Sequence, residues 1–215
     1  MAPIVAGTLC PFAVKARMRG APAYDEGRSL RANLEASVPA FTCFTEDTRT
    51  EELDAFVYRF PRSAVGDDIN RLARLVRTLV EVLLVHDPVD PRVPARRDIL
   101  AARWRLSFAG VDYFAPVFSP VYGKEHSRYT YGVSDSVFVL MQPNSSFHTR
   151  LGSRATKIRG NIRSRFEEAG QPYPSTELEA HKFVLPLNPE DNPVNWYDLP
   201  PFPRDCIAER GLMAS

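Results

Sequence analysis

Trp104-Arg-Leu-Ser-Phe-Ala-Gly-Val-Asp-Tyr-Phe-Ala-Pro-Val-Phe118 predicts two short strands, at 104–109 and 113–118, joined by a tight turn at Gly110-Val-Asp112. Both halves are rich in aromatic and aliphatic residues, and a glycine beside an acidic residue is typical of a short connection between strands. Strands joined so closely pair antiparallel, because a parallel pair needs a long crossover. The sheet of this protein is therefore expected to contain a hairpin.

Helices are expected around this hairpin. The most regular is predicted at 67–85, where apolar residues recur every three or four positions. Other predicted helices cover 29–37 and 154–169, and further strands cover 55–60, 136–141 and 182–187. Helices on both sides of a sheet with a hairpin favour an α+β fold over a doubly wound parallel sheet. We expect a mixed, largely antiparallel sheet packed by helices.

The helix at 154–169 carries an unusual number of cations. Arg154, Lys157, Arg159, Arg163 and Arg165 all lie on it. One interpretation is a surface that binds anions or a partner, and the other is a solvated face, which is the commoner reason for such a run.

The composition sets broad limits on fold and function. A chain of 215 residues with 44% hydrophobic residues is expected to form a single domain, 1–215, which ends in an irregular proline-rich strap at about 188–215. The net charge of +1 gives no field that favours nucleic acid or a membrane surface. Without a long apolar stretch or a signal-peptide pattern, the chain is expected in the cytoplasm. Its three cysteines do not suggest a disulfide framework.

Residues 120–132, Pro-Val-Tyr-Gly-Lys-Glu-His-Ser-Arg-Tyr-Thr-Tyr-Gly, gather polar and aromatic side chains next to the predicted strand at 136–141. This segment is interpreted as the wall of a pocket. His126 is a candidate ligand or acid–base group, and a structural histidine is the alternative. Arg128 suits a carboxylate, since its guanidinium offers two parallel donors, although an ion pair within the protein is equally compatible. Gln142 either presents an amide to the same pocket or satisfies a turn.

Other candidate ligands lie outside this segment. Cys10 is followed by Lys15 and Arg17, whose charges favour a thiolate, while a buried and inert thiol is the alternative. His86 follows the helix at 67–85 and suits a C-terminal cap. His148 and His181 lack partners at metal-ligand spacing and are expected to be ordinary surface residues.

Several of these motifs together resemble the YqcI/YcgG family over roughly residues 8–187. The resemblance rests, in order, on Cys10-Pro-Phe-Ala, the Trp104–Gly110 stretch with Tyr113-Phe114, the segment from Pro120 to Tyr129, and Gln142-Pro with Phe147. This family includes haem-dependent N-oxygenases that hydroxylate a guanidine nitrogen. The resemblance therefore implies haem b as cofactor and oxygenation of a nitrogen in an amino-acid, guanidine or amine substrate.

On this basis the iron ligand is expected to be His126, with Cys10 as the second candidate and His86 as the third. The resemblance further implies that Arg128 binds a haem propionate or a substrate carboxylate, that Tyr122 and Tyr129 line the pocket, and that Gln142 orients the substrate. Electrons or peroxide would come from an external donor, and a homodimer is left open. The chain departs from the family pattern at Tyr122, where many members have histidine.

Two other functions are compatible with these residues. One is a protein that binds haem or another small ligand without catalysis. The other is a hydrolase or transferase with Cys10 as its nucleophile and a distant histidine as its base.

Overall fold

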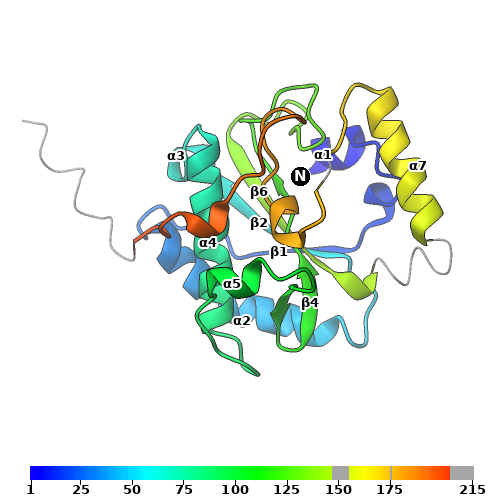
Figure 1. The fold of residues 1–215 in the computed structure, drawn as a ribbon. Helices are drawn as coiled ribbons and strands as arrows, with labels where there is room; N and C mark the ends of the chain where they lie inside the picture. Colours follow the sequence, from blue (N-terminus) through cyan, green and yellow to red (C-terminus); the bar gives the residue numbers. More distant parts are fainter. Residues whose placement is uncertain (147–154, 175, 204–215) are drawn as a thin grey trace, which may run out of the picture.

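The computed structural model describes residues 1–146, 155–174 and 176–203, and it shows the expected α+β fold (Figure 1). The strands are β1 (Met18–Gly20), β2 (Ala55–Pro61), β3 (Leu106–Phe108), β4 (Val111–Phe114), β5 (Val117–Phe118) and β6 (Ser136–Pro143). They form one sheet in the order β1-β2-β6-β4-β3, with β5 also paired to β6. Only β1 and β2 are parallel, so the prediction of a largely antiparallel sheet is confirmed.

The hairpin expected around Gly110 is formed by β3 and β4, with Leu106 opposite Tyr113. Ala109 and Gly110 both have positive φ, of 49° and 75°, as a two-residue hairpin turn with primed geometry requires. The predicted strand at 113–118 is divided at Ala115 and Pro116 into β4 and β5, which both lie along β6. The division has a physical cause, because proline has no N–H to donate to a ladder.

The helices are α1 (Ala2–Gly7), α2 (Leu30–Asp47), α3 (Arg62–Val65), α4 (Ile69–Val85), α5 (Arg96–Ile99) and α7 (Ala155–Glu168). The prediction at 67–85 is confirmed as α4, whose first turn is capped by Asp68 accepting from the N–H of Arg71. The helix predicted at 154–169 is confirmed as α7, and Gly170 follows it with a φ of 72°. α2 begins where expected, after Ser29, but continues ten residues further than the predicted 29–37, through Pro39.

The late strand predicted at 182–187 is wrong. The 3-10 turn η3 (Glu179–Lys182) occupies the start of this segment. The carbonyls of Leu185 and Pro186 are engaged by the side chains of Tyr122 and His126 instead of by a neighbouring strand. These two carbonyls are therefore hydrogen-bonded without pairing to a neighbouring strand.

The sheet has a helix-covered core face and a second, hollowed face. α2 and α4 cover the first, while α1 and α7 lie on the other side (Figure 1). β6 divides its side chains by the period of two: Val137, Val139 and Met141 belong to the main core, whereas Phe138 and Leu140 belong to a smaller cluster with Ile4 of α1. Gln142 follows Leu140 on this second face.

The structure describes the C-terminal strap as far as Pro203. Trp196, in the 3-10 turn η4 (Trp196–Asp198), is fully buried and donates its indole N–H to the carbonyl of Ala180 over 2.7 Å. The remainder of the predicted strap, with Cys206, lies outside the described residues, as do His148 and Phe147. None of the helices in the described part of the chain is long and apolar enough to cross a bilayer.

Candidate functional site

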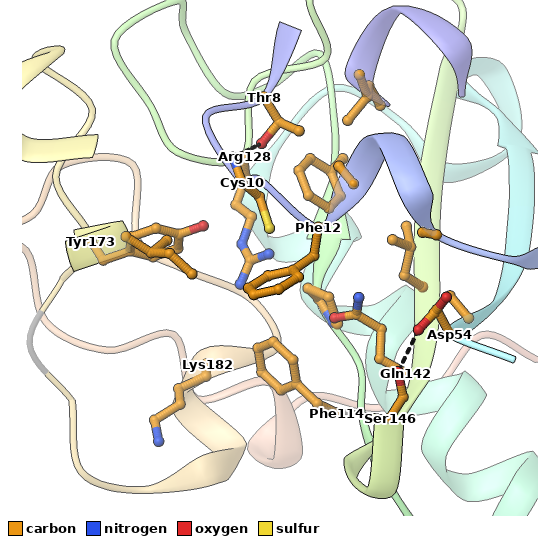
Figure 2. A pocket seen from close by; sticks show the side chains of 18 of the residues that line it. Thr8, Cys10, Phe12, Asp54, Phe114, Arg128, Gln142, Ser146, Tyr173 and Lys182 are labelled. Carbon is orange, nitrogen blue, oxygen red and sulfur yellow. Dashed lines mark hydrogen bonds between the residues drawn. The ribbon is translucent and has the colours of Figure 1, made fainter. Parts of the chain in front are cut away.

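A cavity of about 390 Å³ lies on the second face of the sheet. Its walls come from α1 and the segment after it, from the side of β4, β5 and β6 that faces away from α2 and α4, from α7, and from residues within 173–174 and 176–185. The volume is typical of sites that hold a small organic molecule. Most of the lining surface is apolar, and polar side chains, among them those of Asp54, Arg128 and Gln142, also line the cavity (Figure 2).

Arg128 is the most unusual of these polar groups. Its side chain extends into the cavity, yet the residue is only 5% exposed (Figure 2). The described residues form no ion pair with the guanidinium, and its buried Nε has no hydrogen-bond partner among them. Burial of a charge without a counter-charge costs several kcal/mol. Such a cost is expected where the protein holds the charge ready for a ligand.

Three aromatic rings surround the guanidinium. Its central carbon lies 5.7 Å from the ring centre of Phe114, 5.3 Å from that of Phe118 and 5.6 Å from that of Tyr173. The faces of aromatic rings attract cations and offset part of the desolvation cost. They leave the N–H donors of Arg128 without acceptors, however, so an anion can still bind to them.

His126 fixes the backbone that carries Arg128. Its Nδ1 accepts the backbone N–H of Arg128 over 3.0 Å, which leaves Nε2 as the protonated nitrogen, and Nε2 lies 3.0 Å from the carbonyl of Pro186. The ring stacks on Tyr122 at 4.1 Å between centres, and the Tyr122 hydroxyl donates to the carbonyl of Leu185. Burial lowers the pKa of His126 to about 4, against a smaller opposing effect of the Pro186 carbonyl. His126 is therefore neutral, and its two hydrogen bonds link the segment of Arg128 to that of Pro186.

The three predicted iron ligands lie in different environments. Cys10 is half-buried and lines the cavity, with its backbone N–H donating to Thr8 Oγ1. His126 does not line it, and both ring nitrogens are already hydrogen-bonded. His86 follows α4 on the other face of the sheet, and its Nδ1 lies 2.9 Å from the carbonyl of Val82. Of the three, Cys10 alone presents its donor atom to the cavity.

Among the other predicted site residues, some line the cavity and others do not. Arg128 and Gln142 line the cavity together with Cys10, so the structure brings these three together. Tyr122 and Tyr129 do not line it: Tyr122 is buried against His126, and Tyr129 packs on Tyr131 at 5.2 Å between ring centres.

Tyr173 is a cavity residue that sequence reasoning missed. It lies in the irregular segment after α7, where no periodicity marks it. Burial raises the pKa of its phenol, while the positive charges of Arg128 and Arg163 act in the opposite direction. The phenol is therefore a neutral hydrogen-bond donor beside the guanidinium of Arg128.

Asp54 is a second missed residue, and it lies across the cavity from Tyr173 (Figure 2). Its carboxylate accepts the backbone N–H of Arg17 over 2.7 Å and the hydroxyl of Ser146 over 2.5 Å. These bonds tie the start of β1 to the chain that follows β6.

Positive charge exceeds negative charge around the cavity. Arg128, Arg159, Arg163 and Lys182 contribute cations, against the carboxylates of Asp54 and Glu179. Glu179 is paired with Lys182 at 3.2 Å. The excess of positive charge favours an anionic ligand.

A protein-family model, the YqcI/YcgG family, matches residues 9–183. The chain belongs to the YqcI/YcgG family. No curated protein and no solved structure matches it. The matched part of this YqcI/YcgG domain includes Cys10, Arg128, Gln142 and Tyr173, so these four cavity residues lie within the family region.

Within the described residues of this YqcI/YcgG domain, no group of three or more His, Cys, Asp and Glu side chains is arranged to hold a metal ion. A haem iron needs only one protein donor, so this finding does not bear on haem.

We expect acid to destabilise the protein through His126. The unfolded chain takes up a proton at this residue near pH 6.5, whereas the folded chain does so only near pH 4. The free energy of unfolding should therefore fall between these pH values, by up to about 3 kcal/mol from this residue, and be fully retained above pH 6.5. Urea denaturation from pH 7 to pH 4 measures it. An equally steep pH dependence in a folded His126→Gln variant would contradict this assignment.

Removal of the Arg128 charge should not destabilise the protein without ligand. Arg128→Met exchanges an uncompensated buried cation for an apolar side chain of similar length, so we expect an unfolding free energy that is unchanged or raised by about 1–2 kcal/mol. Arg31 is the matched control: it is 7% exposed but paired with Glu35 at 3.1 Å and Glu81 at 2.7 Å. Arg31→Met should cost about 1–3 kcal/mol, because it removes charged hydrogen bonds to both glutamates. Similar losses in both variants, measured by urea denaturation, would show that Arg128 has a structural partner.

Proposed function

We propose that this protein binds an anionic small molecule in the Arg128 cavity, with the guanidinium as the anchor for a carboxylate. The observation that carries the proposal is the burial of Arg128, at 5% exposure, without an ion pair among the described residues. A carboxylate matches the two parallel donors of a guanidinium, and bonds between charged partners are about twice as strong as neutral ones. The apolar remainder of the lining suits an apolar ligand body.

Haem b is the first candidate for this molecule, on the resemblance to haem-dependent N-oxygenases. Different lining residues of the cavity would hold different parts of the haem. Cys10 would supply the iron ligand, Arg128 would bind a propionate, and the apolar walls would hold the ring. Bound haem would supply oxidising chemistry from dioxygen and an external electron donor, or from peroxide, for the hydroxylation of a nitrogen in an amino-acid, guanidine or amine substrate.

The chain's own residues would then have separate tasks. The neutral phenol of Tyr173 donates a hydrogen bond inside the cavity, and the amide of Gln142 orients a substrate. His126 and Tyr122 act as positioning residues, because they hold the backbone of Arg128. The cytoplasm is the compartment we propose, since it keeps the thiols of Cys10 and Cys43 reduced.

A second candidate function is the carriage or sensing of a carboxylate-bearing molecule without catalysis. The hydrogen bonds of His126 favour it, because both ring nitrogens are engaged and the usual imidazole ligand of haem b is not offered to the cavity. This candidate keeps Arg128 as the anchor and gives Cys10 no metal.

A titration with haemin distinguishes the two functions. We expect a saturable Soret band at one haemin per chain, and a reduced carbon monoxide spectrum of the thiolate-ligated type. Arg128→Gln should weaken binding about ten- to a hundredfold through loss of a charged hydrogen bond. Cys10→Ser should abolish the thiolate-type spectrum, and a folded His126→Gln variant should retain it.

Other results of this titration would change the proposal. An imidazole-type spectrum that disappears in His126→Gln would show that His126 is the iron ligand. The hydrogen bond between His126 Nε2 and the Pro186 carbonyl would then have to break when haem binds. The absence of any specific Soret band would exclude haem and leave the non-catalytic binding function.

A further inference from the structure

The basic residues of α7 divide into two sets that the sequence does not distinguish. Arg159 and Arg163 line the cavity with Ile162, whereas Lys157 and Arg165 on the same helix do not. Residues four apart share one face of a helix, so Arg159 and Arg163 present their side chains to the same region. Part of the run thus belongs to the cavity, and part of it is a solvated face.

Arg159 and Arg163 lie at the mouth of the cavity. Both are exposed although they contribute to its lining, and neither has an ion pair with another residue in the described part of the chain. Arg128, in contrast, is buried deep in the same space. The cavity therefore has one cationic group in its interior and a pair of cations where it opens to solvent.

Tyr173 connects these two cationic regions. Its ring centre is 5.6 Å from the guanidinium carbon of Arg128, and its phenol is within electrostatic reach of both Arg128 and Arg163. A ligand that contacts Arg128 and follows the Tyr173 side of the cavity would reach Arg163. Most of the cavity lining is apolar, and Phe12, Ile162 and Pro174 contribute to it.

We propose that the ligand of this cavity carries two carboxylates on an apolar body, one bound by Arg128 in the interior and the other by Arg159 and Arg163 at the mouth. The inference rests on the proposed function in that Arg128 takes a carboxylate. It adds a second anion subsite on α7. Haem, with its two propionates, and a free long-chain dicarboxylate both have this chemistry.

Two simple acids test the second subsite without haem. Dodecanoate and dodecanedioate have the same number of carbon atoms and differ at one end, where the diacid has a carboxylate in place of the methyl group. Their affinities are measured by calorimetry at low salt and neutral pH. We expect the diacid to bind about five- to tenfold more tightly, because the exposed arginines contribute a modest and salt-sensitive attraction. In the double variant Arg159→Gln/Arg163→Gln this preference should disappear.

The same helix provides the matched control. Lys157→Gln/Arg165→Gln removes two charges outside the cavity, so its preference for the diacid should equal that of the unmodified protein. Loss of the preference in this control would show that the net charge of α7 decides it, and would overturn the subsite.

Haemin and its dimethyl ester identify the source of the carboxylates. Tighter binding of haemin than of the ester, with a difference that shrinks in Arg159→Gln/Arg163→Gln, assigns the two subsites to propionates. A preference seen with dodecanedioate alone assigns them to a free dicarboxylate.

The outcomes separate this inference from the proposed function. Dodecanoate binding that depends on Arg128, with no gain from a second carboxylate, overturns the α7 subsite and leaves the proposed function intact. If none of these carboxylates binds, both are overturned.

Discussion

Among the residues that the structure describes, the Arg128 guanidinium is buried without a counter-charge, and the site is organised around this group. The buried Arg31 differs, because its guanidinium is paired with the carboxylates of Glu35 and Glu81. The neighbours of the Arg128 guanidinium are the aromatic rings of Phe114, Phe118 and Tyr173. Aromatic faces lower the cost of burying the cation but occupy none of its N–H donors. The arrangement keeps the charge buried and its donors available to a ligand, as recognition of an anion in an apolar cavity requires.

The fold supplies the support for this group. The segment that carries Arg128 is irregular, so its geometry depends on bonds to other parts of the chain. His126 provides them by bridging the Arg128 backbone and Pro186, and Tyr122 packs against the imidazole and bonds to Leu185. The sequence suggested a reactive role for His126. In the structure this residue instead links two chain segments in its neutral form, because burial keeps it unprotonated. The aromatic core beneath the sheet, where Phe41 packs on Phe56, Phe108 and Tyr113, keeps the strands that form the cavity wall in place.

The sequence predicted what local patterns control. The hairpin at Gly110 and the helix after Asp68 follow from turn chemistry and apolar periodicity, and Arg128, Cys10 and Gln142 were recognised as site candidates from their surroundings. Tertiary contacts decided the rest. The residues at 182–187 have strand-like composition, but the carbonyls of Leu185 and Pro186 bond to side chains. Whether His126 faced the cavity depended on Pro186, sixty residues away. Tyr173 lacked any local signal, and the choice between the cavity and solvent for the cations of α7 required the position of that helix.

The most direct test of the account is the stability of the unmodified protein and of Arg128→Met, each with and without haemin or dodecanoate. A ligand at a hundred times its dissociation constant stabilises the protein that binds it by about 2.7 kcal/mol. The unmodified protein should gain this stability, whereas the variant, with an affinity ten- to a hundredfold weaker, should gain only about 0.4–1.4 kcal/mol at the same ligand concentration. Without ligand, the variant should be at least as stable as the unmodified protein. Equal stabilisation of both proteins would contradict the role of Arg128 as the anion anchor.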